Sequence, residues 1–101
     1  MKTIAGIAAL SLFASSAIAQ EWIGQADYPA SVLQQRREGI VEVELTFDNS
    51  GRVVGCDIRR SSGTALLDAT TCRLLVRRAR ATAAEPRTRI YTHQWRLPPQ
   101  P

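Results

Sequence analysis

The sequence predicts an α+β domain of order α-β-β-α-β, with helices packed on one face of a three-stranded antiparallel sheet. Three observations carry this prediction. Residues 40–47 alternate between apolar and polar side chains and are followed by a turn and a second apolar run. Residues 65–80 carry apolar side chains at helical spacing. Two cysteines fall one on each of these elements, Cys56 in the second run and Cys72 in the helix, where pairing would join them.

A short helix is expected to open at Tyr28-Pro29 and to end at Glu38-Gly39. Pro29 suits the first helical position, because its φ is fixed and it needs no N–H partner there. The apolar side chains of this helix are Ala30, Val32 and Leu33.

The next two segments predict a β-hairpin. Every second side chain of the first strand is expected on its buried face: Val41, Val43, Leu45 and Phe47. Residues 48–51 form the turn, since Asn and Gly tolerate positive φ. The returning strand is expected to direct Val54, Cys56 and Ile58 to one side, and Val53, Gly55, Asp57 and Arg59 to the other.

Residues 61–64 offer a capping hydroxyl for the long helix at 65–80. Its expected buried stripe consists of Ala69, Cys72, Leu75, Val76 and Ala79. A last strand at 89–97 is expected to turn Tyr91, His93, Trp95 and Leu97 at least partly toward the core. Residues 98–101 form a proline-rich tail that cannot continue a sheet.

Residues 1–19 have the pattern of a secretory signal peptide. Lys2 supplies the positive charge, residues 4–13 the apolar region, and Ala19 ends a small-x-small cleavage site. The alternative is an uncleaved membrane anchor, although the uncharged stretch is shorter than the roughly 20 residues of a spanning helix. Residues 20–27 are expected to be a lead-in segment.

Export favours a disulfide between Cys56 and Cys72. Their spacing is not CxxC, and with a single histidine the chain has too few ligands for a structural zinc site. Because the two cysteines lie on the inward faces of the second strand and the long helix, their pairing would pin the helix across the hairpin. No cofactor or metal is expected.

The chain also offers little for catalysis. His93 is the one general base with a pKa near neutral, so a small exported enzyme would depend on it; the alternative is a packed residue of the sheet. Arg73, Arg77 and Arg80 recur on one side of the long helix and could bind anionic cell-wall or lipid groups. The alternative for these arginines is a solvated face, because twelve arginines meet nine acidic residues. Export makes nucleic acid an improbable partner.

A three-stranded sheet leaves two edges, and an exposed edge can accept a strand from another protein. The alternative is an edge covered by the N-terminal segment or by the proline tail. Edge-to-edge homodimers are also compatible with so small a sheet.

The ordered features from Asp27 to Leu97 resemble the TonB C-terminal domain family. The resemblance rests on Tyr28-Pro29, on Glu38-Gly39 before the alternating strand, and on Gly51 in the turn. Ser61-Ser62-Gly63 and Leu67-Asp68 at the start of the helix complete it. The domain is therefore placed at residues 28–97. The Cys56 and Cys72 pair resembles a variant of the family in which the second strand is tied to the helix.

The resemblance implies a non-catalytic periplasmic domain that binds the TonB box of outer-membrane receptors by strand addition and serves transmembrane transport. The edge expected to receive the peptide is Ile90, Tyr91, Thr92, His93, Gln94 and Trp95. Full transducers of the family carry an uncleaved transmembrane helix and a proline-rich spacer. This chain is expected to be a small exported form without either, or an inner-membrane tethered one if the leader stays attached.

Overall fold

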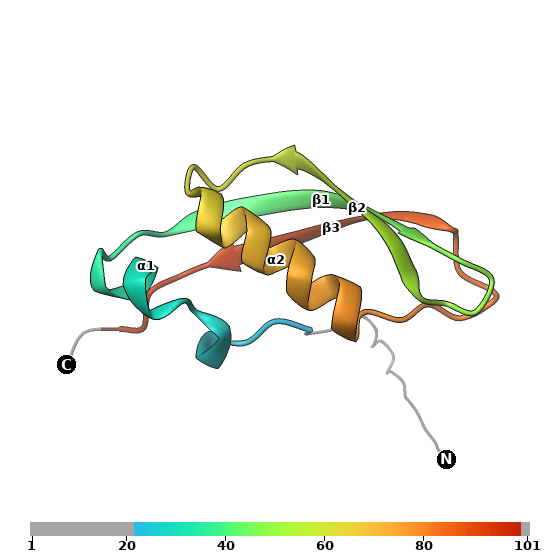
Figure 1. Cartoon of the computed structure of the whole chain (residues 1–101), viewed down its shortest axis with the longest axis horizontal. Coiled ribbons are helices and arrows are strands. Elements are labelled where there is room, and N and C mark those ends of the chain that lie inside the picture. Colours follow the sequence, from blue (N-terminus) through green and yellow to red (C-terminus); the bar gives the residue numbers. More distant parts are fainter. Residues whose placement is uncertain (1–21, 100–101) are drawn as a thin grey trace, which may run out of the picture.

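The computed structural model describes residues 22–99, so the expected signal peptide, its cleavage after Ala19 and the last two residues of the tail lie outside the described residues. The element order is η1 (Gln25–Asp27), α1 (Ala30–Gln34), β1 (Gly39–Phe47), β2 (Val53–Arg60), α2 (Ala65–Arg78) and β3 (Thr88–Trp95). The predicted α+β fold is confirmed: α2 packs across a three-stranded antiparallel sheet (Figure 1).

The strand that the sequence defined best, β1, lies at the centre of the sheet. The strand order is β2-β1-β3, and both neighbours run antiparallel to β1. The β1–β3 ladder is uninterrupted from Gly39 opposite Trp95 to Thr46 opposite Thr88. The predicted inward residues of β1 are all buried, whereas Glu42 and Glu44 remain partly exposed on the other face.

The core lies between the sheet and α2. Its largest fully buried side chains are Trp95, Phe47, Ile23, Leu45, Leu67 and Leu75. The Trp95 indole donates a 2.9 Å hydrogen bond from Nε1 to Oγ1 of Thr71, which is also fully buried. The Thr71 hydroxyl in turn donates to the Leu67 carbonyl at 2.7 Å. This chain of hydrogen bonds satisfies the Trp95 N–H and the Thr71 hydroxyl within the core.

Leu75 and Ala79 are buried as expected, but the long helix otherwise turns a different face to the core. Leu67, Thr70, Thr71, Leu74 and Leu75 are its buried residues. Ala69 and Val76, expected in the stripe, are exposed, and Cys72 is only partly buried. The physical reason is the size of the side chains. Burying Leu67 and Leu74 removes more apolar area from water than burying Ala69 would.

The same helix ends at Arg78 and not at Arg80. Ala79 is fully buried and has an extended ψ of 141°, which takes the chain out of the helix. Arg80 then forms an isolated β-bridge with Arg52. It therefore does not share a helix face with Arg73 and Arg77.

The inward face of β2 also differs from the prediction, and the cause is a β-bulge. Phe47 is opposite Val53 whereas Thr46 is opposite Gly55, which leaves Val54 as the extra residue. Val53 is consequently buried and Val54 is 64% exposed. Cys56 keeps the expected face, opposite the buried Leu45.

Two further elements end earlier in the chain than predicted. The first helix spans only Ala30–Gln34, because Pro29 has an extended ψ of 134° and caps the helix without joining it. Arg36, at a φ of 54°, lies just beyond its end, and Val32 is its one buried residue. The last strand ends at Trp95, after which the Leu97 amide donates to the Glu38 carboxylate at 2.8 Å.

The expected disulfide joins Cys56 of β2 to Cys72 of α2, with a Cα–Cα distance of 5.8 Å. It connects the edge of the sheet to the helix that crosses it.

Candidate functional site

The outer edge of β3 is the longest regular edge of the sheet. The Phe47 amide donates to the Arg87 carbonyl, which makes these two residues a hydrogen-bonded pair of the β1–β3 ladder. Such pairs alternate with non-bonded pairs in an antiparallel ladder. The backbone groups of alternate residues of β3 therefore point away from β1: those of Thr88, Ile90, Thr92 and Gln94.

No backbone hydrogen bond to this outer edge is formed by any other part of residues 22–99. The side chains of Ile90, Thr92 and Gln94 are exposed, and Ile90 is 57% exposed. The edge thus offers alternating N–H and C=O groups over about 20 Å, at roughly 3.3 Å per residue.

The opposite edge, β2, is irregular. Its ladder with β1 shifts register twice, once at Val54 and again between Glu42 and Val43, where Arg59 is the extra residue. Bulges increase the local twist and disturb the even spacing that a new strand needs. The two edges of this sheet are therefore not equivalent.

The segment before α1 lies beside β3 and belongs to the core. Ile23 is 1% exposed, and the Trp22 ring lies 5.5 Å from the ring of Tyr91. The Arg89 guanidinium lies over the Trp22 ring at 6.0 Å from its centroid. Sequence reasoning missed this contribution, because residues 20–27 have no hydrophobic period; the pair Trp22-Ile23 was the one available signal.

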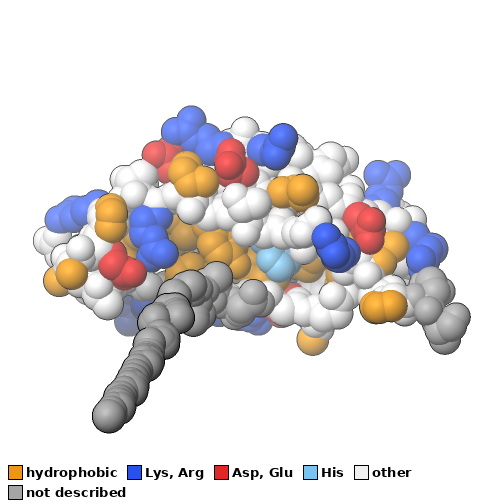
Figure 2. Space-filling model, turned by 180° about the vertical axis from the view of Figure 1, so that it is seen from behind, with side chains coloured by type: hydrophobic (Ala, Val, Ile, Leu, Met, Phe, Trp, Pro, Cys, Tyr) orange, Lys and Arg blue, Asp and Glu red, His pale blue; other side chains and the backbone are white. Residues whose placement is uncertain are grey.

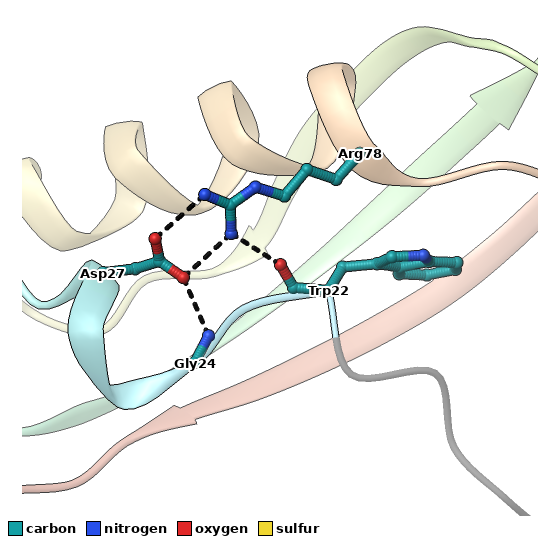
Figure 3. A network of polar contacts seen from close by, with 4 residues as sticks. All are labelled: Trp22, Gly24, Asp27 and Arg78. Atoms are coloured by element: carbon teal, nitrogen blue, oxygen red, sulfur yellow. Dashed lines mark hydrogen bonds and ion pairs between the residues drawn. The ribbon is translucent and has the colours of Figure 1, made fainter.

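This segment is fastened to α2 by one ion pair (Figure 3). The Arg78 guanidinium donates to both carboxylate oxygens of Asp27, at 2.8 and 3.0 Å, and also to the Trp22 carbonyl at 2.8 Å. The Gly24 amide donates to the same carboxylate at 2.8 Å. The hydrogen bonds from Arg78 and then Gly24 lower the pKa of Asp27.

Two hollows flank the C-terminal half of β3. One, of about 170 Å³, is lined by Ile23, Gly24, Gln25, Tyr28, His93, Gln94, Trp95 and Arg96. The other is open, of about 570 Å³, and is lined by Glu38, Gly39, Ile40, Gln94, Trp95, Arg96 and Leu97. Figure 2 shows hydrophobic side chains gathered around the one histidine of the chain on this side of the molecule. Alternate side chains of an added strand would have room on both faces.

The six predicted edge residues divide into two sets. Ile90, Thr92 and Gln94 direct their backbone groups outward, whereas Tyr91, His93 and Trp95 bond to β1 and turn their side chains toward the helix layer. His93 packs edge-on to Trp95, with 4.7 Å between ring centroids.

The predicted arginine face consists of Arg73 and Arg77, which are exposed, since Arg80 has left the helix. No group of three or more His, Cys, Asp or Glu side chains that could hold a metal ion occurs in the described part of the chain. Within residues 22–99, no helix combines the length and hydrophobicity needed to cross a bilayer.

Residues 24–99 match the model of the family described as Gram-negative bacterial TonB protein C-terminal, and the chain belongs to this family. Neither a search of curated proteins nor a search of solved structures found a match. Membership makes the protein a TonB-like domain. The family acts in envelope transport and generally binds proteins such as outer-membrane receptors.

Proposed function

We propose that the protein is a non-catalytic periplasmic module that binds an extended protein segment by strand addition to the outer edge of β3. The observation that carries this proposal is the unbroken run of outward backbone groups from Thr88 to Gln94. Main-chain hydrogen bonds supply affinity in this mode of recognition, and pockets for alternate side chains supply specificity.

The proposed ligand is the TonB box of an outer-membrane receptor, the kind of partner with which the family is associated. The hollows beside Gln94 and Trp95 support a ligand whose alternate side chains occupy both faces. The aromatic rings on the helix side, including Tyr28 and His93, favour an apolar or aromatic anchor there.

The proposal is tested by titrating the labelled protein with synthetic TonB-box peptides while recording amide shifts. Thr92→Pro should weaken binding at least tenfold, because proline removes an outward N–H donor from the middle of the edge. The fold should survive, since that N–H makes no bond to β1.

Ile58→Pro is the matched control. The residues of β1 that bond to β2 alternate with those that bond to β3, so Ile58 directs its own N–H outward from the opposite edge. Its affinity for the peptide should stay within about twofold of the unmodified protein. Equal losses for the two variants, or amide shifts confined to α2, would reject addition at β3.

We also propose export with cleavage after Ala19. Support comes from the leader pattern and from the family, whose domains are found in the envelope. The intact mass of the protein recovered from the periplasm tests this point, because it distinguishes a chain beginning at Gln20 from one beginning at Met1.

A further inference from the structure

A second exposed feature lies on the opposite side of the molecule from the β3 edge, between β2 and α2. It is a shallow apolar groove of about 480 Å³, and its exposed apolar side chains are Val54 of β2, 64% exposed, and Val76 of α2, 45% exposed. Gly55 and the Cys56–Cys72 disulfide complete the floor. The groove shares no lining residue with the hollows beside β3.

The charges on this groove have one sign. Arg73 and Arg77 line it at positions i and i+4 of α2, and no carboxylate lines it. Within residues 22–99, no acidic side chain forms an ion pair with either arginine, whereas Arg59, Arg78 and Arg89 each have an acidic partner. Two adjacent guanidinium groups beside apolar surface complement an acidic, apolar ligand.

The walls of the groove are fixed relative to each other. The disulfide joins β2 to α2 within the groove itself, and the bulge at Val54 turns that side chain outward. A groove with fixed walls loses little conformational freedom when a ligand enters it, which favours specific docking.

We propose that this groove docks an acidic amphipathic helix of a partner protein. The helix would place apolar side chains over Val54 and Val76, and carboxylates one turn apart against Arg73 and Arg77. A helical ligand fits better than an added strand, because β2 is interrupted by bulges at both ends of its ladder. A concave surface with two arginines is also a poor match for a flat lipid bilayer, which favours a broad basic face.

The test uses a fluorescent synthetic helix with leucines on one face and glutamates at i, i+4 flanking them, and an otherwise identical helix with lysines. The acidic helix should bind and shift the amide signals of Val54, Gly55, Val76 and Arg77. The double variant Arg73→Glu/Arg77→Glu should weaken binding at least tenfold, and so should Val76→Asp alone.

Arg36→Glu/Arg37→Glu is the matched control, because it makes the same change in net charge on two exposed arginines beyond α1. Its affinity should remain within about twofold of the unmodified protein. Equal loss in both double variants would show a nonspecific charge effect and overturn the proposal. Equal binding of the lysine helix, or binding of anionic phosphatidylglycerol vesicles without the acidic helix, would overturn it as well.

The groove and the β3 edge are two separate binding surfaces in this proposal. A TonB-box peptide should not displace the acidic helix, and Thr92→Pro should leave the affinity for the helix unchanged. Displacement by that peptide, with shifts along β3, would mean that the helix occupies the β3 edge and would overturn the groove site.

Discussion

At the scale of single residues, Thr71 joins the two layers of the fold. It accepts a hydrogen bond from the Trp95 indole and donates one to the Leu67 carbonyl, and all three side chains are shielded from water. A neighbouring threonine, Thr70, is buried to a similar degree, but none of the side-chain hydrogen bonds found within residues 22–99 involves it. The two positions therefore separate the effect of burial from that of hydrogen bonding.

Thr71→Val should lower the free energy of unfolding by about 1–3 kcal/mol, because it leaves the buried Trp95 N–H without an acceptor. Thr70→Val should be neutral or slightly stabilising, since it replaces a buried hydroxyl with a methyl group. Urea unfolding followed by tryptophan fluorescence measures both. Equal costs for the two substitutions would contradict the role assigned to the Trp95–Thr71 hydrogen bond.

Asp27 gives the protein a pH dependence at the same scale. Its pKa in the folded protein lies below the ordinary value of about 3.9, chiefly because Arg78 donates to the carboxylate. The ionised form is thus favoured by folding. Its contribution to stability is complete above about pH 5 and is lost progressively as the pH falls through the unfolded and then the lowered folded pKa.

Asp27→Asn should therefore destabilise the protein at pH 7, by about 1 kcal/mol for a partly exposed pair, and the difference from the unmodified protein should shrink as the pH falls through the lowered pKa. Unfolding curves at a series of pH values measure this difference. In a carboxyl titration by NMR, Arg78→Ala should raise the pKa of Asp27, whereas Arg73→Ala should leave it unchanged. A difference that grows as the pH falls would contradict the linkage.

At the scale of elements, the sequence predicted what a regular pattern specifies. The alternation in β1, the turn with Gly51 at a φ of 86° and the identity of α2 all follow from residue types at fixed spacing. The two cysteines also fell on elements that pack together, as their pattern indicated.

The remaining features depend on contacts that no local pattern encodes. The bulge at Val54 reverses the expected faces at the start of β2, and the early end of α2 removes Arg80 from the arginine face. Ile23 contributes to a core that is formed mostly by later segments of the chain. The pairing of Asp27 with Arg78 joins residues about 50 positions apart. The candidate edge was therefore predictable as a strand, but the alternation of its outward groups required the register.

The disulfide is the covalent link between elements, and it closes a segment with a sequence separation of 16. Cys56→Ala/Cys72→Ala should lower the free energy of unfolding by about 3 kcal/mol, mainly because the unfolded chain gains freedom. Urea unfolding with and without reductant measures the effect. The reduced natural protein should unfold like the double variant, and an unchanged midpoint on reduction would contradict this expectation.

At the scale of the whole molecule, the two edges of the sheet differ in regularity. Any pairing between copies is expected to use β3, because β2 carries two bulges. At high concentration the protein should therefore sediment as nothing larger than a dimer, and Thr92→Pro should keep it monomeric. Sedimentation velocity measures both, with Ile58→Pro as the control that still dimerises. Species that keep growing with concentration would mean that β2 also accepts strands.

The bulges of β2 thus decide how far such association can go. A sheet that can be extended from two sides is a seed for fibres, whereas one that can be extended from a single side stops after the first addition. A partner segment and a second copy of the chain would compete for the β3 edge, so binding of either would prevent binding of the other.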